Sequence, residues 1–276
     1  MTNSKTLKDK TIFITGASRG IGKAIALRCA KDGAFIILAS KSESEGKLPG
    51  TIYSAAEEIE QAGGKALPLP LDLRLESSIQ EMVKKVYAKT DKIDALINNA
   101  GAISLTPVEM TPPKKIDLMF SLNVRAVLAL SHYFIPALKK ANGAHILNLS
   151  PPLSLDPKWL PGHTPYSISK YGMSLATLGM AEELRDDKIA VNSLWPRTLI
   201  ASAATKMLFG EEGMKNCRTE EIMADAAYEI LCSDPTQLTG QLLLDEGILK
   251  SKGYSDFEKY RVDPNTEPSL DLYVSE

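Results

Sequence analysis

The stretch Thr11-Ile-Phe-Ile-Thr-Gly-Ala-Ser-Arg-Gly-Ile-Gly22 decides the fold, because it joins three structural signals in one order. Its first five residues are a β-branched, apolar run that predicts a short strand. A glycine-rich turn follows, and the apolar periodicity of residues 21–30 predicts a helix. We expect Gly16 to permit a tight turn, Gly20 to let backbone approach a pyrophosphate, and Gly22 to let the helix pack close to the strand. This order predicts a dinucleotide site with its phosphates at the helix N-terminus.

Strand-like and helix-like segments alternate along the rest of the chain. Short apolar runs predict further strands at residues 34–40, 66–71, 93–98, 144–150, 189–195 and 241–245. Helical patterns predict helices at residues 51–62, 75–89, about 118–140 and 166–185. Such alternation indicates a parallel sheet that is covered on both faces. The expected fold class is therefore α/β, a Rossmann-type doubly wound, seven-stranded parallel sheet with helices on both faces and ligands beyond the carboxyl ends of its strands.

Length and composition set the outer bounds on function. The 276 residues suit one large domain, which we place at residues 1–250, with a C-terminal extension at 251–276 that is either disordered or laid across a neighbour. The net charge of −2 gives no argument for binding nucleic acid or an anionic membrane. No apolar run approaches the roughly 20 residues of a membrane span. The cysteines and histidines lack disulfide or metal-ligand spacing, so we expect no metal, and the polar N-terminus favours the cytoplasm.

A tyrosine and a lysine stand one helical turn apart in Tyr166-Ser-Ile-Ser-Lys170. Residues four apart on a helix share one face, so both side chains can reach one small site. The unperturbed pKa of a tyrosine hydroxyl is about 10, and a neighbouring ammonium lowers it, as a general acid/base requires. Alone, this spacing also fits an ordinary surface pair. The dinucleotide motif at the other end of the chain favours the catalytic interpretation.

Taken together, these motifs resemble those of the short-chain dehydrogenase/reductase family over about residues 7–250. The matching segments occur in the family's order: Thr15-Gly16-x-x-x-Gly20-x-Gly22, Asn98-Asn99-Ala100-Gly101, Asn123 and Tyr166-x-x-x-Lys170. The likeness is closer still to a hydroxysteroid dehydrogenase-like subgroup, through Ile146-Leu-Asn-Leu-Ser-Pro-Pro-Leu153 and Trp195-Pro-Arg197. Animal members of this subgroup carry an appended sterol-carrier domain and a peroxisomal signal, neither of which we expect here.

The resemblance implies a role for each matching residue. Tyr166 would give a proton to a carbonyl oxygen as hydride arrives from a nicotinamide, or take it in the reverse direction. Lys170 would bind the nicotinamide ribose and lower the pKa of Tyr166. Asn123 would hold a water that links Lys170 to solvent, unless it only caps a helical turn. The expected cofactor-binding residues are Gly16, Ser18, Arg19, Gly20, Ile21, Gly22, Lys41, Asp72, Asn98, Ala100, Gly101, Tyr166 and Lys170. Among them, Asp72 would accept a hydrogen bond from the adenine amino group, unless it is a solvated loop residue.

Local charge favours NADP over NAD as the cofactor. An NAD enzyme of this layout usually carries an acid at the end of the second strand, where it accepts hydrogen bonds from the ribose hydroxyls. Here Ser40 takes that place, with Lys41 beside it and Arg19 in the glycine turn. These cations could pair with a 2′-phosphate, although two surface cations are common anywhere.

The chain departs from the family pattern at two places. The family's catalytic serine follows the fifth strand. Counted back from the tyrosine its position falls on Leu153, and counted from the end of the strand it falls on Pro151, which Ser150 and Ser154 flank. Either serine, or neither, replaces the usual donor. The second departure is Arg197, where relatives usually have glycine. It either meets an acidic substrate or the cofactor diphosphate, or points to solvent.

The sequence predicts an NADP-dependent oxidoreductase that acts on a ketone, an aldehyde or a secondary alcohol, carried on an apolar small molecule. The alternative is an NADP(H)-binding regulatory or scaffold module with little turnover. The irregular serine loop favours that alternative, whereas the intact Tyr166, Lys170 and Asn123 oppose it. Because family members commonly pair the Tyr166 helix across a dimer, a homodimer or homotetramer is expected.

Overall fold

Seven strands form one parallel sheet in the structure, a computed structural model that describes residues 6–46 and 49–275. They are β1 (Thr11–Thr15), β2 (Phe35–Ser40), β3 (Lys65–Pro70), β4 (Ala95–Asn98), β5 (Ala144–Asn148), β6 (Ile189–Trp195) and β7 (Leu242–Leu244). Their order is β3-β2-β1-β4-β5-β6-β7, so the direction in which strands are added reverses between β1 and β4. The predicted Rossmann-type, doubly wound sheet is confirmed.

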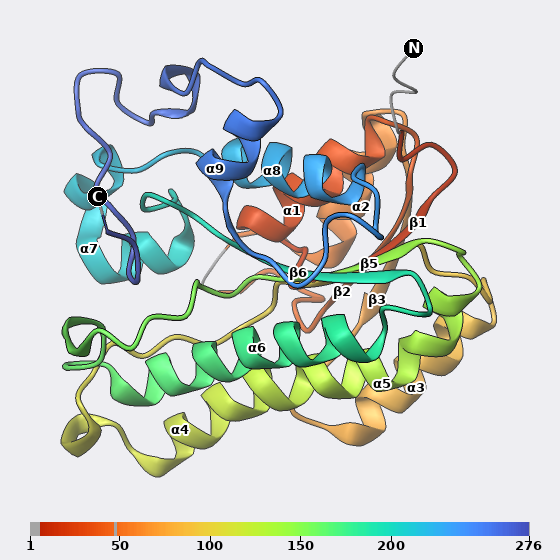
Figure 1. Ribbon diagram of the computed structural model, residues 1–276, viewed down its shortest axis with the longest axis horizontal. Helices are drawn as coiled ribbons and strands as arrows, with labels where there is room; N and C mark the ends of the chain where they lie inside the picture. The colour runs from red at the N-terminus through yellow and green to blue at the C-terminus, as the bar shows by residue number, and fades with distance from the viewer. Residues whose placement is uncertain (1–5, 47–48, 276) are drawn as a thin grey trace.

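Helices cover both faces of this sheet (Figure 1). One face carries α1 (Gly20–Ala30), α2 (Ile52–Gln61), α8 (Glu221–Leu231) and α9 (Asp245–Ser251), and the other carries α3 (Glu76–Tyr87), α4 (Pro113–Phe120), α5 (Ala126–Lys139) and α6 (Thr164–Glu183). Successive side chains of β1 divide between the two layers, as the pleat of a strand requires. Ile12 and Ile14 pack with α1 and α8, whereas the ring of Phe13 lies 4.8 Å from that of Phe134 on α5.

The helical run after Pro112 is not one regular helix. A π-helical turn, Ser121–Arg125, separates α4 from α5 and contains Asn123. Single π turns of this kind are frequent at functional sites. By length and composition alone, the run Pro113–Lys139 is apolar enough to cross a membrane. It packs against the sheet, however, through buried side chains such as Phe134.

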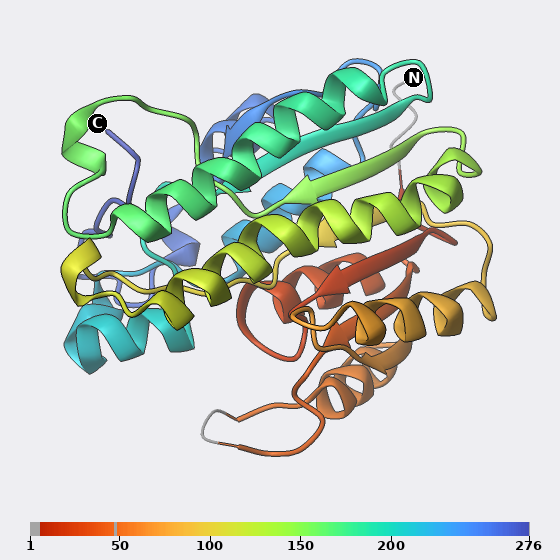
Figure 2. The same cartoon turned by 90° about the horizontal axis from the view of Figure 1, so that it is seen from below.

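Several elements were not predicted. Near the end of the chain they are α7 (Ala203–Lys215), α8, α9 and the 3₁₀ turn Glu258–Tyr260, and earlier in the chain they are the short 3₁₀ turns Val108–Met110 and Pro157–Trp159. The expectation that the C-terminal extension is disordered or laid across a neighbour was wrong for residues 251–275, which pack on their own chain. The Asp271 amide donates to the Arg197 carbonyl at 3.0 Å, and the Ser269 amide donates to the Asn216 carbonyl at 2.9 Å. The strand-like segment around Ser269 therefore lies beside the end of α7, beyond the carboxyl ends of the sheet strands (Figure 1). The last residues continue to the loop before α6, where the Lys158 ammonium donates to Oγ of Ser275 at 3.2 Å (Figure 2).

Candidate functional site

Two adjoining cavities form one groove at the carboxyl ends of the strands. The glycine-turn cavity, of about 480 Å³, lies between the Gly16–Gly20 turn and the ends of β2 and β3. The tyrosine cavity, of about 260 Å³, contains Tyr166 and Lys170. Both cavities are lined by Asn99, Gly101, Ala102, Ser202 and Ala204. The groove thus lies where the strand order reverses, which is where open α/β sheets bind their ligands.

Most of the predicted cofactor-binding residues line this groove. Those in the glycine-turn cavity are Gly16, Ser18, Arg19, Gly20, Lys41, Asp72, Ala100 and Gly101. Those in the tyrosine cavity are Ile21, Gly101, Tyr166 and Lys170. Two predicted residues, Gly22 and Asn98, line neither cavity.

The glycine turn is shaped for close approach of backbone to a ligand. Gly16 has a φ of +67°, and a Cβ added to it would lie 3.0 Å from the Cα of Ala100. A Cβ on Gly22 would lie 2.6 Å from the Gly16 carbonyl oxygen, so only glycine lets α1 pack this closely on the turn. At Gly20, where α1 begins, an added Cβ would meet nothing within 4 Å. Arg19, at the N-cap, forms no side-chain cap, so the first amides of α1 are open to an anion, which fits a pyrophosphate.

The two side chains of the Asn98–Asn99 pair have different positions: Asn98 lies inside the sheet and Asn99 lies in the groove. The side-chain amide of Asn98 is buried and donates to Oδ1 of Asn148 at 2.8 Å, which ties β4 to β5 below the groove. The amide of Asn99 donates to the carbonyls of Thr15 and Gly16, at 2.9 and 3.1 Å, and so holds the glycine turn in place. Asn99 is the groove residue of the two, and sequence reasoning missed it. The path of the backbone after β4 decides which of the two asparagine side chains points into the groove. That path could not be predicted from the motif.

Charged side chains surround the far end of the glycine-turn cavity. Arg74, which was not predicted, lines it beside Asp72, and its Nε donates to Oδ1 of Asp72 at 2.9 Å. This hydrogen bond holds the pKa of Asp72 below its usual value. The Nε of Arg19 donates to the Pro49 carbonyl at 2.9 Å. Lys41 follows β2 at the same end of the cavity, where an NAD enzyme usually carries its acid.

Tyr166 and Lys170 lie together in the tyrosine cavity, one turn apart on α6. Their side chains are almost fully enclosed, with 5 % and 7 % exposed. The ammonium of Lys170 donates to the Leu149 carbonyl and lies 5.0 Å from the ring centroid of Trp195. Burial lowers the pKa of Lys170 to about 7, although the carboxyl of Asp271 opposes this shift. Burial also raises the pKa of Tyr166 well above its usual value, whereas the sequence predicted a lowered one.

Asn123 fixes the segment after β4 against α6. Its amide donates to the Ala102 carbonyl at 3.0 Å and to Oγ of Ser169 at 2.9 Å, and its Oδ1 accepts from the Ala102 amide at 2.9 Å. A Cβ on Gly101 would lie 2.9 Å from that oxygen. Asn123 is fully buried and lines neither cavity. Its water-holding role stays a prediction.

Neither serine of the irregular loop lies in the tyrosine cavity. Oγ of Ser150 is buried and has no hydrogen-bond partner among the described residues. Oγ of Ser154 accepts from the Asp156 amide at 3.2 Å, within its own loop. Arg197 also lines neither cavity, since its Nε pairs with Glu246 at 3.7 Å. None of these three residues lines the tyrosine cavity.

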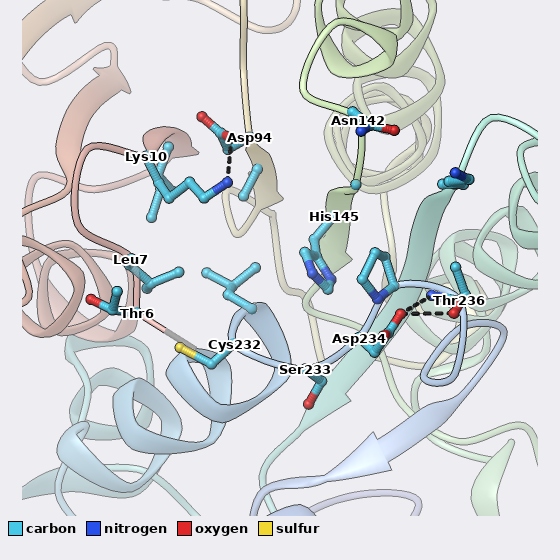
Figure 3. Close-up of a pocket in the computed structure, with 16 residues that line it drawn as sticks. Thr6, Leu7, Lys10, Asp94, Asn142, His145, Cys232, Ser233, Asp234 and Thr236 are labelled. Atoms are coloured by element: carbon cyan, nitrogen blue, oxygen red, sulfur yellow. Dashed lines mark hydrogen bonds and ion pairs between the residues drawn. The ribbon is translucent and has the colours of Figure 1, made fainter. Parts of the chain in front are cut away.

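A further hollow of about 430 Å³ opens at the opposite end of the sheet (Figure 3). Lys10 and Asp94 lie at its wall and form an ion pair at 3.0 Å, and His145 and Cys232 also line it. This hollow lies at the amino ends of the strands, far from Tyr166, and we assign it no chemistry. Among the residues that the structure describes, no three potential metal ligands gather at one point, and the three cysteines are free.

A glycine turn at a strand-order reversal, joined to a buried tyrosine–lysine pair, defines a dinucleotide-dependent oxidoreductase of Rossmann type. The chain belongs to the short chain dehydrogenase family, whose model matches residues 10–211. Members of this family use nicotinamide cofactors and act on small molecules.

Individual relatives agree with this assignment. The chain is 55 % identical over 273 residues to hydroxysteroid dehydrogenase-like protein 2 of Danio rerio. The aligned region covers 99 % of this chain and 65 % of that protein. It therefore spans just under two thirds of the relative's length. A putative dehydrogenase from Xanthomonas campestris has a TM-score of 0.94 and 46 % identity, over 98 % of this chain and 100 % of that one. A metagenomic short-chain oxidoreductase in complex with NADP has a TM-score of 0.72 and 26 % identity, over 86 % and 97 % of the two chains. The closer resemblance to the hydroxysteroid dehydrogenase-like subgroup is confirmed.

Proposed function

We propose that this protein is an NADP(H)-dependent oxidoreductase that interconverts a ketone or aldehyde and the corresponding alcohol on an apolar substrate. One observation carries the proposal: Tyr166 and Lys170 are buried in a cavity that continues directly into the glycine-turn cavity. A bound nicotinamide would supply the hydride in reduction and accept it in oxidation. The remaining steps fall to the residues of this chain.

Tyr166 acts as the general acid in the reducing direction. Because burial keeps its pKa high, the hydroxyl is protonated at neutral pH and can give its proton to the substrate oxygen. Lys170 lies one turn away, where its ammonium can bind ribose hydroxyls and stabilise the phenolate that remains. Tyr166 as proton donor and Lys170 as ribose-binding group are the roles that we propose, and the water-holding role of Asn123 is proposed with them.

The lining of the tyrosine cavity supports an apolar substrate. Its side chains come from the loop after β4, from β6 and the segment that follows it, and from α7. They include Ile103, Leu105, Trp195, Leu199, Leu208 and Phe209. The test is NADPH consumption against a panel of ketones, aldehydes and fatty-acyl carbonyls. Turnover that depends on Tyr166 supports the proposal. Tight NADPH binding without turnover across the panel would contradict it and favour a regulatory or scaffold module.

The exposed face of α6 supports a homo-oligomer. Ile168, Leu175 and Leu178 lie about one or two turns apart and are 52 %, 59 % and 38 % exposed. Apolar side chains aligned in this way on one helix fit the face of a subunit contact. Sedimentation of the purified chain would test this part of the proposal.

The cofactor preference follows from the charges at the end of β2. Lys41, Arg19 and Arg74 line the glycine-turn cavity there, and the metagenomic relative was solved with NADP. We expect NADPH to bind at least about tenfold more tightly than NADH, since a charge-assisted contact to phosphate contributes about 1.5–3 kcal/mol. Lys41→Glu should remove most of this preference, because it places an acid where a 2′-phosphate would lie.

Titration of both cofactors by fluorescence checks this preference. Lys84→Glu is the matched control, because it makes the same charge change on the exposed side of α3, outside both cavities. The control should leave both affinities unchanged. Equal loss of NADPH affinity in the two variants would mean that net charge, and not a local contact, sets the preference.

A further inference from the structure

The C-terminal strap, residues 269–275, forms part of the wall of the tyrosine cavity. Asp271 and Leu272 line the cavity together with Tyr166. The indole of Trp195 donates to the Leu272 carbonyl at 2.9 Å, and the hydroxyls of Tyr273 and Ser167 lie 3.0 Å apart. These contacts, which directly follow Asp271, and the hydrogen bond from its own amide to the Arg197 carbonyl fix its backbone at the cavity.

Most side-chain hydrogen-bond donors in the wall of the tyrosine cavity already donate to other groups of the protein. The Trp195 indole donates to the strap, and the Asn99 amide donates to two carbonyls of the glycine turn. Oγ1 of Thr205 donates to the Ile200 carbonyl at 2.6 Å, so the Ser202 hydroxyl, 2.9 Å away, donates to Thr205 in turn. None of these groups is left to bind a substrate oxygen.

Asp271 is different because one of its oxygens has no partner. Its Oδ1 accepts from the Leu272 amide at 2.6 Å, whereas Oδ2 forms no hydrogen bond with the described residues. The side chain is half-buried, since it borders the cavity. Beside Tyr166 and Lys170, it is the one titratable side chain that the described part of the chain contributes to this wall.

We propose that Asp271, in its protonated form, donates the second hydrogen bond to the substrate oxygen, in place of the serine that this chain does not bring to the cavity. This inference rests on the proposed reductase function. Asp271 keeps its proton throughout: the hydride comes from the nicotinamide, and the proton that the oxygen gains comes from Tyr166. The donated hydrogen bond stabilises the negative charge that develops on the oxygen.

Burial favours the protonated carboxyl of Asp271, and the groups around it act in both directions. Those that interact with it are Lys170, Tyr166, Tyr273, Cys217 and Asp245. Burial is the main cause that raises the pKa of Asp271 to about 7, and Asp245 adds to it, whereas the Leu272 amide and Lys170 act in the opposite direction. The donor is therefore fully present below this pKa and is lost as the pH rises above it.

Two substitutions of Asp271 distinguish a role as hydrogen-bond donor to the substrate from a role in holding the strap in place. Asp271→Ala removes the donor, so kcat/KM for carbonyl reduction should fall by about 10²-fold below pH 7. The difference should shrink above that pH, where the unsubstituted protein has itself lost the donor. Asp271→Asn keeps both the acceptor for the Leu272 amide and a donor at the second position, so it should retain most of the activity. In the unsubstituted protein, kcat/KM should fall as the pH rises above about 7, and Asp271→Asn should make that fall shallower, leaving only the part that Lys170 contributes.

The assay follows NADPH oxidation by the full chain with decanal, 2-decanone and phenanthrenequinone, and Tyr166→Phe is run in parallel. Unchanged kcat/KM in Asp271→Ala, beside turnover that is lost in Tyr166→Phe, would overturn the role of Asp271 and leave the reductase proposal standing. A pH profile of Asp271→Asn that falls as steeply as that of the unsubstituted protein would also overturn it and would assign the whole fall to Lys170, whose pKa is similar. Absence of any Tyr166-dependent turnover would overturn both proposals.

Discussion

Tyr166→Phe is expected to lower kcat for carbonyl reduction by about 10³-fold, within the range that positioned acid/base groups contribute. The substitution removes the proton donor and keeps the ring, which packs with Met119, Trp195 and Tyr273. The cavity should therefore keep its shape, and NADPH affinity should change by no more than about twofold, or 0.4 kcal/mol. Single-turnover measurements with saturating NADPH would separate this loss from slow product release.

Tyr171→Phe provides the matched control for this prediction. It removes a hydroxyl from the same helix, five residues later, from a side chain that does not line the tyrosine cavity. This variant should retain turnover close to that of the unsubstituted protein. If Tyr166→Phe retained turnover as well, Tyr166 would not be the general acid.

Tyr273→Ala is expected to lower the free energy of unfolding by about 3–5 kcal/mol, as loss of a buried aromatic side chain does. The side chain is only 4 % exposed, and its ring lies 5.2 Å from that of Tyr171, 6.0 Å from that of Trp195 and 6.2 Å from that of Trp159. Its φ of +68° lies in the left-handed region, which a bulky residue occupies only when packing holds it there. The same variant should lose activity, because the strap closes the tyrosine cavity.

Tyr273→Phe isolates the ring from the hydroxyl. It should cost only about 1 kcal/mol, the typical worth of a hydrogen bond such as the one with Ser167. Denaturant unfolding of both variants measures the difference. Equal stability of the two variants would mean that the strap does not dock on the cavity in solution.

The sequence predicted those features for which a residue type at a given spacing has only one structural explanation. Gly16 and Gly22 stand where an added Cβ would collide with backbone, so the glycine turn could be read directly from the chain. Tyr166 and Lys170 share a helix face through their spacing alone. The sheet followed from apolar runs that alternate with helical patterns, which is why all its strands were found within a few residues.

The parts that were missed depend on contacts between distant segments. Asp271 reaches the cavity because the strap pairs with the segment after β6, more than 70 residues earlier in the chain. No local sequence pattern in residues 251–276 predicts that pairing. The pKa of Tyr166 was predicted in the wrong direction because sequence spacing shows the neighbouring Lys170 but not the burial, which is the main cause of the raised pKa. Arg74 pairs with Asp72 across a turn whose direction only the fold determines.

The most direct test of the account is transfer of deuterium from NADPH labelled at C4 of the nicotinamide to a carbonyl substrate. Reduction at the groove predicts an alcohol with one deuterium on its carbinol carbon, formed by the unsubstituted protein and not by Tyr166→Phe. Mass spectrometry of the products reads this outcome without reference to rates. Tight NADPH binding with no deuterium in any ketone, aldehyde or fatty-acyl product would contradict the account.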